Sequence, residues 1–161
     1  GLVEGLAWQE VIDGLHHSFT QLRLATVRAT SGALIIDDTY NASPESTLAA
    51  LNLLSEIDGN RVAVLGDMLE LGPYEQEGHE LVGVRAAEVA RRLITVGRLG
   101  KQIARAARQA GMPSSAIESV DDVSQAIDLL QNTLKADDVV LVKGSHGLRM
   151  DRIVASLEAD S

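Results

Sequence analysis

Short apolar runs alternate with helical stretches along most of this chain, and this alternation constrains its fold more than any other feature. Four runs are nearly continuous in apolar residues, at 33–36, 62–65, 93–96 and 139–142. Runs of this length are typical of parallel strands that are covered on both faces. The stretches between them repeat their apolar residues at helical spacing. The pattern predicts a doubly wound, Rossmann-like α/β fold with a mostly parallel sheet.

One strand is expected to pair in the antiparallel direction, because residues 21–30 have strand character and Ser31-Gly32 turns the chain into the strand 33–37. Other strands are expected at 61–65, 93–96, 116–120 and 138–142. Helices are expected from Pro44 to near Gly59, from Glu75 to Arg92, through Ile103 to Gly111, from Asp121 to Leu134, and from the glycine-rich segment 143–147 onward.

Composition narrows the class of protein. With 161 residues, 45% of them hydrophobic and only 2% aromatic, the chain suits one domain whose core consists of aliphatic side chains, as in helices packed on a parallel sheet. A net charge of −9 argues against a nucleic-acid or anionic-membrane surface. The absence of cysteine excludes a disulfide framework, a zinc-thiolate site and a cysteine nucleophile. No signal peptide or long apolar span is recognisable, so the cytoplasm is the expected compartment.

The segment 37–45 joins an apolar run to a helix start. Ser43 is a favoured N-cap, Pro44 suits the first helical position because no N–H is needed there, and Glu45 suits the positive end of the helix dipole. Residues 37–42 should therefore be displayed between the carboxyl end of a strand and the amino end of a helix, where open α/β sheets bind ligands. An ordinary turn is the simpler interpretation of these residues taken alone.

Two more loops are expected at the same edge of the sheet, Gly66-Asp67-Met68-Leu69-Glu70-Leu71-Gly72 and Lys143-Gly144-Ser145-His146-Gly147. Asp67 and Glu70 could orient a substrate amine, although capping is the commoner role of acids in a turn. Lys143 and Ser145 at a helix amino end would suit an anion, whereas an exposed lysine in a glycine-rich turn is the alternative. The segment 97–101, Gly-Arg-Leu-Gly-Lys, is not a P-loop, because only two residues separate its glycines and Gln102 follows the lysine.

Residues 37–44, Asp-Asp-Thr-Tyr-Asn-Ala-Ser-Pro, resemble the nucleotide loop of the Mur ligases. The blocks at 66–72 and 142–145 match later signatures of that family in the same order, and the resemblance covers nearly the whole chain. Tyr40-Asn41, without a loop histidine, favours the branch that joins D-alanyl-D-alanine to UDP-N-acetylmuramoyl-tripeptide. The resemblance implies an ATP- and Mg²⁺-dependent ligase of peptidoglycan precursor synthesis that acts through an acyl phosphate.

The resemblance also implies roles for single residues. The residues that it assigns to ATP are Arg23 at a phosphate, and Asp38, Tyr40 and Asn41 at the ribose and adenine. The residues that it assigns to the acceptor or the UDP-peptide are Lys143, Ser145 and His146. Leu22 stands where the family usually has glycine, and His146 where it often has arginine. No catalytic residue and no metal ligand is assigned within this chain.

The same resemblance divides the chain. Residues 1–20 resemble the tail of a preceding central ATPase domain, and residues 21–161 the C-terminal, Rossmann-like ligase domain. The P-loop, the magnesium ligands and a UDP-binding domain would lie upstream and would be partners of this domain. The fragment alone is therefore expected to fold without catalysing ligation.

Two other classes of protein remain alternatives. A response-regulator receiver also has paired acids after a strand and a lysine after its last strand, as in Asp37-Asp38 and Lys143, but its phosphorylated aspartate follows a central strand, and Gly66-Asp67 comes too early for that. A nicotinamide oxidoreductase is disfavoured because no Gly-x-Gly-x-x-Gly follows any expected strand.

Overall fold

The computed structural model describes residues 24–159. The strands are β1 (Ala25–Arg28), β2 (Leu34–Asp38), β3 (Asn60–Gly66), β4 (Arg92–Val96), β5 (Ile117–Val120) and β6 (Asp138–Lys143). The α-helices are α2 (Pro44–Ser55), α3 (Glu75–Val89), α4 (Gly100–Gln109), α5 (Val123–Thr133) and α6 (Asp151–Leu157). Short 3-10 helices lie at Gly72–Tyr74, Ser114–Ala116 and His146–Leu148.

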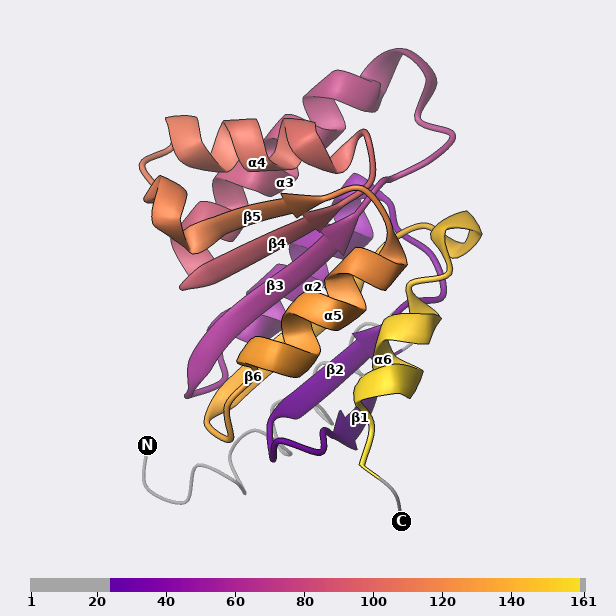
Figure 1. Cartoon of the computed structure of the whole chain (residues 1–161). Helices are drawn as coiled ribbons and strands as arrows, with labels where there is room; N and C mark the ends of the chain where they lie inside the picture. The colour runs from indigo at the N-terminus through magenta and orange to yellow at the C-terminus, as the bar shows by residue number, and fades with distance from the viewer. Residues whose placement is uncertain (1–23, 160–161) are drawn as a thin grey trace.

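The described strands form a single six-stranded sheet in the order β1-β2-β6-β3-β4-β5 (Figure 1). β1 pairs with β2 in the antiparallel direction, and all other neighbours are parallel. The predicted mostly parallel sheet with one antiparallel hairpin strand is therefore confirmed. Within the described residues the hairpin strand ends at Arg28 rather than at the predicted residue 30, because Ala29 begins the turn and Thr30 N donates to Leu157 O at the end of α6.

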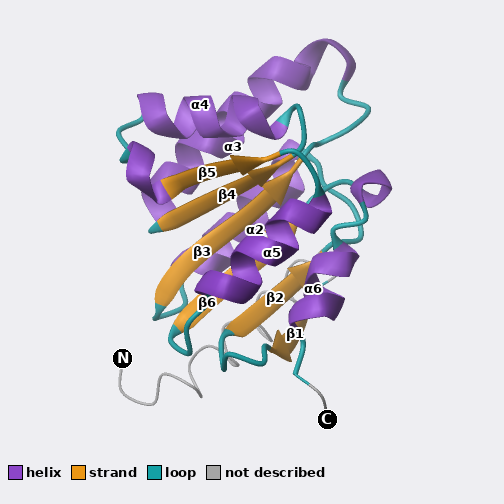
Figure 2. Cartoon of the chain, viewed as in Figure 1, coloured by secondary structure: helices purple, strands orange, loops and turns teal. Residues whose placement is uncertain are grey.

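Helices cover both faces of the sheet, as Figure 2 shows. Because side chains alternate along a strand, each strand supplies both cores. Ile36 and Leu141 pack in the core beneath α2, α3 and α4, whereas Ile35 and Val140 pack in the core beneath α5 and α6. The doubly wound arrangement follows from apolar runs that face helices on either side.

Local signals set several helix boundaries. α2 begins at Pro44, as predicted, and the Ser43 hydroxyl accepts from Ser46 N at 3.1 Å in a capping box. α3 ends at Val89 rather than at the predicted Arg92, because Ala90 is already extended and Arg92 begins β4.

The predicted start of the last helix is wrong. The segment 143–147 does not open it, because Lys143 still belongs to β6 and residues 146–148 form a 3-10 turn. Arg149 then adopts a left-handed conformation with φ of 58°. An α-helix cannot pass through such a residue, so α6 begins only at Asp151.

The order in which the parallel strands are added reverses at β6, the last strand, which lies between β2 and β3. The helix after β2, α2, packs against β3 and β6, whereas the helix after β6, α6, packs on the opposite face against β2. Where adjacent parallel strands send their helices to opposite faces, a crevice opens at their carboxyl ends. The three predicted loops all meet at this edge, because Asp38 and Leu65 both lie opposite Lys143 in the register.

This strand order excludes the receiver alternative. In a receiver the first strand lies between the second and the third. Here the first parallel strand, β2, lies next to the last strand, β6, and next to the antiparallel β1. Within residues 24–159, no helix combines the length and the apolar character that crossing a membrane requires.

Candidate functional site

The two adjacent aspartates at the end of β2 point to opposite faces of the sheet. Ile36 belongs to the core beneath α2 and Ile35 to the core beneath α6. Because the side-chain period of a strand is two residues, Asp38 continues on the side of Ile36 and Asp37 on the side of Ile35. The pair therefore contributes one carboxylate to each side of the carboxyl edge.

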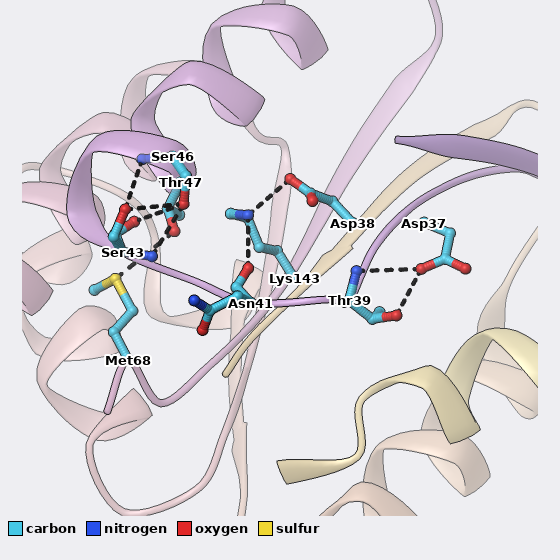
Figure 3. Close-up of polar contacts among 9 residues, drawn as sticks. All are labelled: Asp37, Asp38, Thr39, Asn41, Ser43, Ser46, Thr47, Met68 and Lys143. Carbon is cyan, nitrogen blue, oxygen red and sulfur yellow. Dashed lines mark hydrogen bonds and ion pairs between the residues drawn. The ribbon is translucent and has the colours of Figure 1, made fainter. Parts of the chain in front are cut away.

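On the α2 side, Asp38 forms a buried ion pair with Lys143. Lys143 Nζ lies 2.8 Å from Asp38 Oδ2, and the exposed fractions of the two side chains are 3% for Asp38 and 2% for Lys143. The same Nζ donates to the backbone oxygen of Asn41 at 2.9 Å (Figure 3). The expectation that residues 37–42 are all displayed to a ligand is thus wrong for Asp38, which the parallel pairing of β2 with β6 buries against a basic partner.

Burial raises the pKa of the Asp38 carboxyl above its ordinary value, and the Lys143 ammonium opposes that rise. An unpaired carboxylate would be very costly at this depth. The ion pair is therefore what allows a charged aspartate to end a strand inside the fold.

On the α6 side lies an open hollow of about 260 Å³. Its described lining residues are Ala25, Asp37, Thr39, Tyr40, His146 and Asp151. Tyr40 and His146 both line the hollow, and their ring centroids lie 6.3 Å apart. Tyr40 is 57% exposed. The structure thus brings together a residue assigned to ATP and a residue assigned to the other substrates.

Two carboxylates give this hollow its chemical character. Asp37 Oδ1 accepts from Thr39 N at 3.2 Å and from Thr39 Oγ1 at 2.7 Å, a turn that fixes the carboxylate at the rim. Asp151 receives two hydrogen bonds of 3.0 Å from the Arg149 guanidinium, which hold the pKa of Asp151 below its ordinary value. Carboxylate oxygens accept hydrogen bonds from hydroxyl and amino groups and repel phosphate.

Ser145 joins the loop after β6 to the loop after β3. Its side-chain oxygen accepts from Leu69 N at 2.8 Å, and its own N–H donates to Asp67 O at 3.0 Å. Ser145 is only 4% exposed. The structure therefore places this residue between two loops, with its hydroxyl already bonded to the backbone.

Asp67 caps α4. Its Oδ1 accepts from Gly100 N at 2.9 Å, at the first residue of that helix. This contact agrees with the capping interpretation of the acids in this loop. Glu70 is exposed and adopts a left-handed backbone with φ of 65°.

Two glycines let the segment after β6 lie directly on the strand ends. A Cβ atom on Gly66 would lie 2.7 Å from Leu148 Cδ1, and one on Gly144 would lie 2.7 Å from Met150 Cγ. Met150 is fully buried between these positions. The close approach brings His146 to the rim of the hollow.

His79 supports the loop after β3 from behind. It is fully buried; its Nε2 accepts from Met68 N at 3.0 Å, and its Nδ1 lies 2.6 Å from Glu75 O. Since a backbone carbonyl can only accept, the proton is on Nδ1. His79 therefore has a structural role in this loop.

Sequence reasoning assigned no role to four lining residues of the hollow, Ala25, Asp37, Thr39 and Asp151, and the two aspartates carry its chemistry. Asp37 had a local signal, because an aspartate two residues before a threonine at a strand end is typical of an Asx turn. Asp151 had none, because its place depends on the turn at residues 146–149. Arg23 and the predicted tail 1–20 lie outside the described residues. Within residues 24–159, no three histidine or acidic side chains are grouped closely enough to hold a metal ion.

Comparison with known proteins identifies the family of this chain. The family described as "Mur ligase, glutamate ligase domain" matches residues 22–146, which is most of the chain. The chain belongs to the Mur ligase family. The resemblance of residues 37–44, 66–72 and 142–145 to that family is thereby confirmed, and the fold is that of a Mur ligase C-terminal domain.

Relatives within the family agree on one branch. The chain is 35% identical to the UDP-N-acetylmuramoyl-tripeptide--D-alanyl-D-alanine ligase of Bacillus subtilis, over 98% of this chain and 35% of that protein. It is 34% identical to the ligase of the same name from Escherichia coli, over 84% of this chain and 29% of that protein. The chain thus spans about a third of the length of the curated relatives that it matches.

Solved structures give the same result. The MurF ligase from Thermotoga maritima, in complex with ADP, matches with a TM-score of 0.66 and 32% identity, over 81% of this chain and 29% of that one. A MurF from Acinetobacter baumannii matches with a TM-score of 0.73 and 29% identity, over 84% of this chain and 30% of that one. A folylpolyglutamate synthase from Thermotoga maritima, at 14% identity and a TM-score of 0.54, shares the fold alone.

Proposed function

We propose that this chain is the C-terminal domain of an ATP-dependent ligase that joins D-alanyl-D-alanine to UDP-N-acetylmuramoyl-tripeptide through an acyl phosphate. The observation that carries the proposal is the hollow at the β2–β6 crevice, lined by the Asp37–Tyr40 segment, in a chain 35% identical to a ligase of that name. A cytoplasmic location is part of the same proposal, because ATP and a nucleotide-linked precursor are cytoplasmic substrates.

The hollow fits part of ATP. Its two carboxylates can accept hydrogen bonds from ribose hydroxyls or an adenine amine, and the exposed Tyr40 ring offers a surface for a base. Its described lining residues include two aspartates and neither lysine nor arginine, which suits a sugar and a base better than a triphosphate. The proposal therefore assigns the sugar and base to this domain, and the phosphates to Arg23 and to the upstream domains.

Each assigned residue then has a task. Tyr40 and Asn41, both exposed, contact the base and ribose, and Asp37 is the accessible carboxylate beside them. His146 lies across the hollow from Tyr40 and contacts the acceptor or the UDP-peptide. A contact with a nucleotide held between the Tyr40 and His146 rings is the alternative. Asp38, Lys143 and Ser145 are buried and influence binding through the loops that they hold.

Mg²⁺ belongs to the proposed reaction but not to this domain. Magnesium prefers several oxygen ligands in octahedral geometry. The part of the chain that the structure describes offers no such cluster. As the family resemblance implies, the proposal assigns the ion and the catalytic groups to the upstream domains, and it predicts that residues 1–161 alone do not catalyse ligation.

The test uses the longer protein that contains this chain. Phosphate release is measured with ATP, Mg²⁺, D-alanyl-D-alanine and the UDP-tripeptide, each varied in turn. Loss of a buried base contact by Tyr40→Ala should raise the KM for ATP roughly tenfold, equivalent to about 1.4 kcal/mol. Tyr74→Ala is the matched control, because Tyr74 is a similarly exposed tyrosine, 66% exposed, that does not line the hollow.

Two outcomes would contradict the proposal. A longer protein that releases no phosphate with these three substrates would refute the ligase assignment. Equal ATP kinetics for Tyr40→Ala and Tyr74→Ala would refute the hollow as the place of the nucleotide.

A further inference from the structure

Lys143 reaches the 37–42 loop from the α2 side, away from the hollow. Its two hydrogen bonds go to Asp38 Oδ2 and to the backbone oxygen of Asn41. These acceptors lie three residues apart and bracket Thr39 and Tyr40. One ammonium group thus fixes both ends of the short segment that carries the exposed Tyr40 ring.

Asn41 makes this contact with its backbone and not with its side chain. Its backbone oxygen faces Lys143, and Figure 3 shows its carboxamide turned the other way. Thr39 is fixed separately by its hydrogen bonds to Asp37. Contacts on either side of Tyr40 and Asn41 therefore help to orient them, and Lys143 on β6 supplies one from another strand.

We infer that Lys143 is a positioning residue that holds Tyr40 toward the hollow and fixes the backbone of Asn41 beside it, rather than a residue that contacts a substrate. A side chain that is 2% exposed, and that already donates to a carboxylate and a carbonyl, could meet a ligand only by moving out of this site and away from Asp38. That departure would leave the Asp38 carboxylate buried and unpaired, which is costly. Where the inference concerns ATP, it rests on the proposed function; where it concerns the loop, it does not.

The first experiment needs no ligand. Amide spectra and hydrogen exchange are recorded for residues 39–42 in the chain Gly1–Ser161, for the wild type, Lys143→Met, and Asp38→Asn combined with Lys143→Met. Lys101→Met is the matched control, because Lys101 is a 60% exposed lysine whose ion pair with Asp121 spans 3.6 Å. The double variant contains no lone buried charge, so it should fold even if Lys143→Met does not.

Positioning predicts a specific pattern. In both Lys143 variants the amides of Tyr40 and Asn41 should shift and exchange at least tenfold faster, whereas Lys101→Met should leave them unchanged. The double variant should melt at a higher temperature than Lys143→Met, but the amides of Tyr40 and Asn41 should still exchange faster than in the wild type. Loop amides that match those of the wild type in the folded double variant would overturn the inference.

The second experiment uses the longer ligase. The double variant should raise the KM for ATP roughly tenfold, with smaller changes in kcat and in the KM values of the other two substrates. A raised KM for D-alanyl-D-alanine or the UDP-tripeptide, with an unaltered loop, would instead make Lys143 a substrate contact and overturn the inference. A wild-type protein without ligase activity would refute the proposed function alone, because the loop spectra would still decide the role of Lys143.

Discussion

The replacement of Ser145 by alanine tests how the rim of the site is held together. The Ser145 hydroxyl oxygen is the acceptor of the Leu69 N–H, 76 residues away in the sequence, at 2.8 Å. Alanine removes that acceptor and changes little else, because the backbone contact from Ser145 N to Asp67 O is retained. We expect Ser145→Ala to destabilise the domain and to loosen the loop after β3.

The magnitude follows from the environment of the lost bond. A buried donor left without an acceptor costs about 1–3 kcal/mol. This bond is only partly buried, so water can replace part of it, and the expected loss is about 1–2 kcal/mol. For a domain of this size each kcal/mol lowers the melting temperature by about 2–4 °C, so the expected decrease is about 2–8 °C.

The assay is a thermal melt of residues 1–161 together with hydrogen exchange of the Leu69 amide. Ser124→Ala provides the control, because Ser124 is an exposed serine on α5 and its loss should change stability by no more than about 0.5 kcal/mol. If the two variants melt together and the Leu69 amide exchanges at the wild-type rate, the hydroxyl does not hold this loop, and its assignment to a substrate gains weight instead.

Three further changes have expected outcomes. Gly83→Ala should lower the free energy of unfolding by about 1–2 kcal/mol in a denaturant melt, because the added Cβ would lie 2.4 Å from Ile103 O. This clash should outweigh the better helix propensity of alanine. Gly147→Ala is the control and should be tolerated, because its Cβ would lie 3.5 Å from Leu69 Cδ1. The pKa of the Asp151 carboxyl, measured by NMR, should lie below 3.8 and should rise in Arg149→Gln. The stabilising contribution of Asp151 is present above its unfolded pKa and is lost as pH falls through its lowered folded pKa. The Asp38 carboxyl should titrate above 3.8, and Lys143→Met should raise its pKa further, since Lys143 opposes the effect of burial.

Much of the fold was predictable because its signals are local. A continuous apolar run indicates a strand covered on both faces, and Ser43-Pro44 indicates a helix start; both interpretations hold in the structure. The prediction that the glycine-rich segment 143–147 opens the last helix was wrong, because glycine and serine suit a tight turn as well as they suit a helix start. The conformation of Arg149, which delays α6 to Asp151, depends on the packing of Met150 against Gly66 and Gly144.

The site was less predictable, because its contacts cross the sheet. Asp38 and Lys143 are 105 residues apart and meet only because β6 enters the sheet beside β2. No property of either local sequence specifies that strand order. The sequence therefore identified both residues as notable and separated them into two binding roles, whereas in the structure they bond to each other.

The position of β6 makes the site depend on the whole domain. β2, which leads into the 37–42 loop, has only the antiparallel β1 on one side, and its parallel neighbour is the last strand of the chain. Until β6 is in place, Asn41 O lacks its donor and Asp38 lacks its counter-charge, so two contacts that hold the loop are missing. Because Ser145 on the same chain segment also fastens the loop after β3, a single strand insertion orders both neighbouring loops at once. The geometry that presents Tyr40 and Asn41 is therefore a property of the completed fold rather than of the motif that contains them.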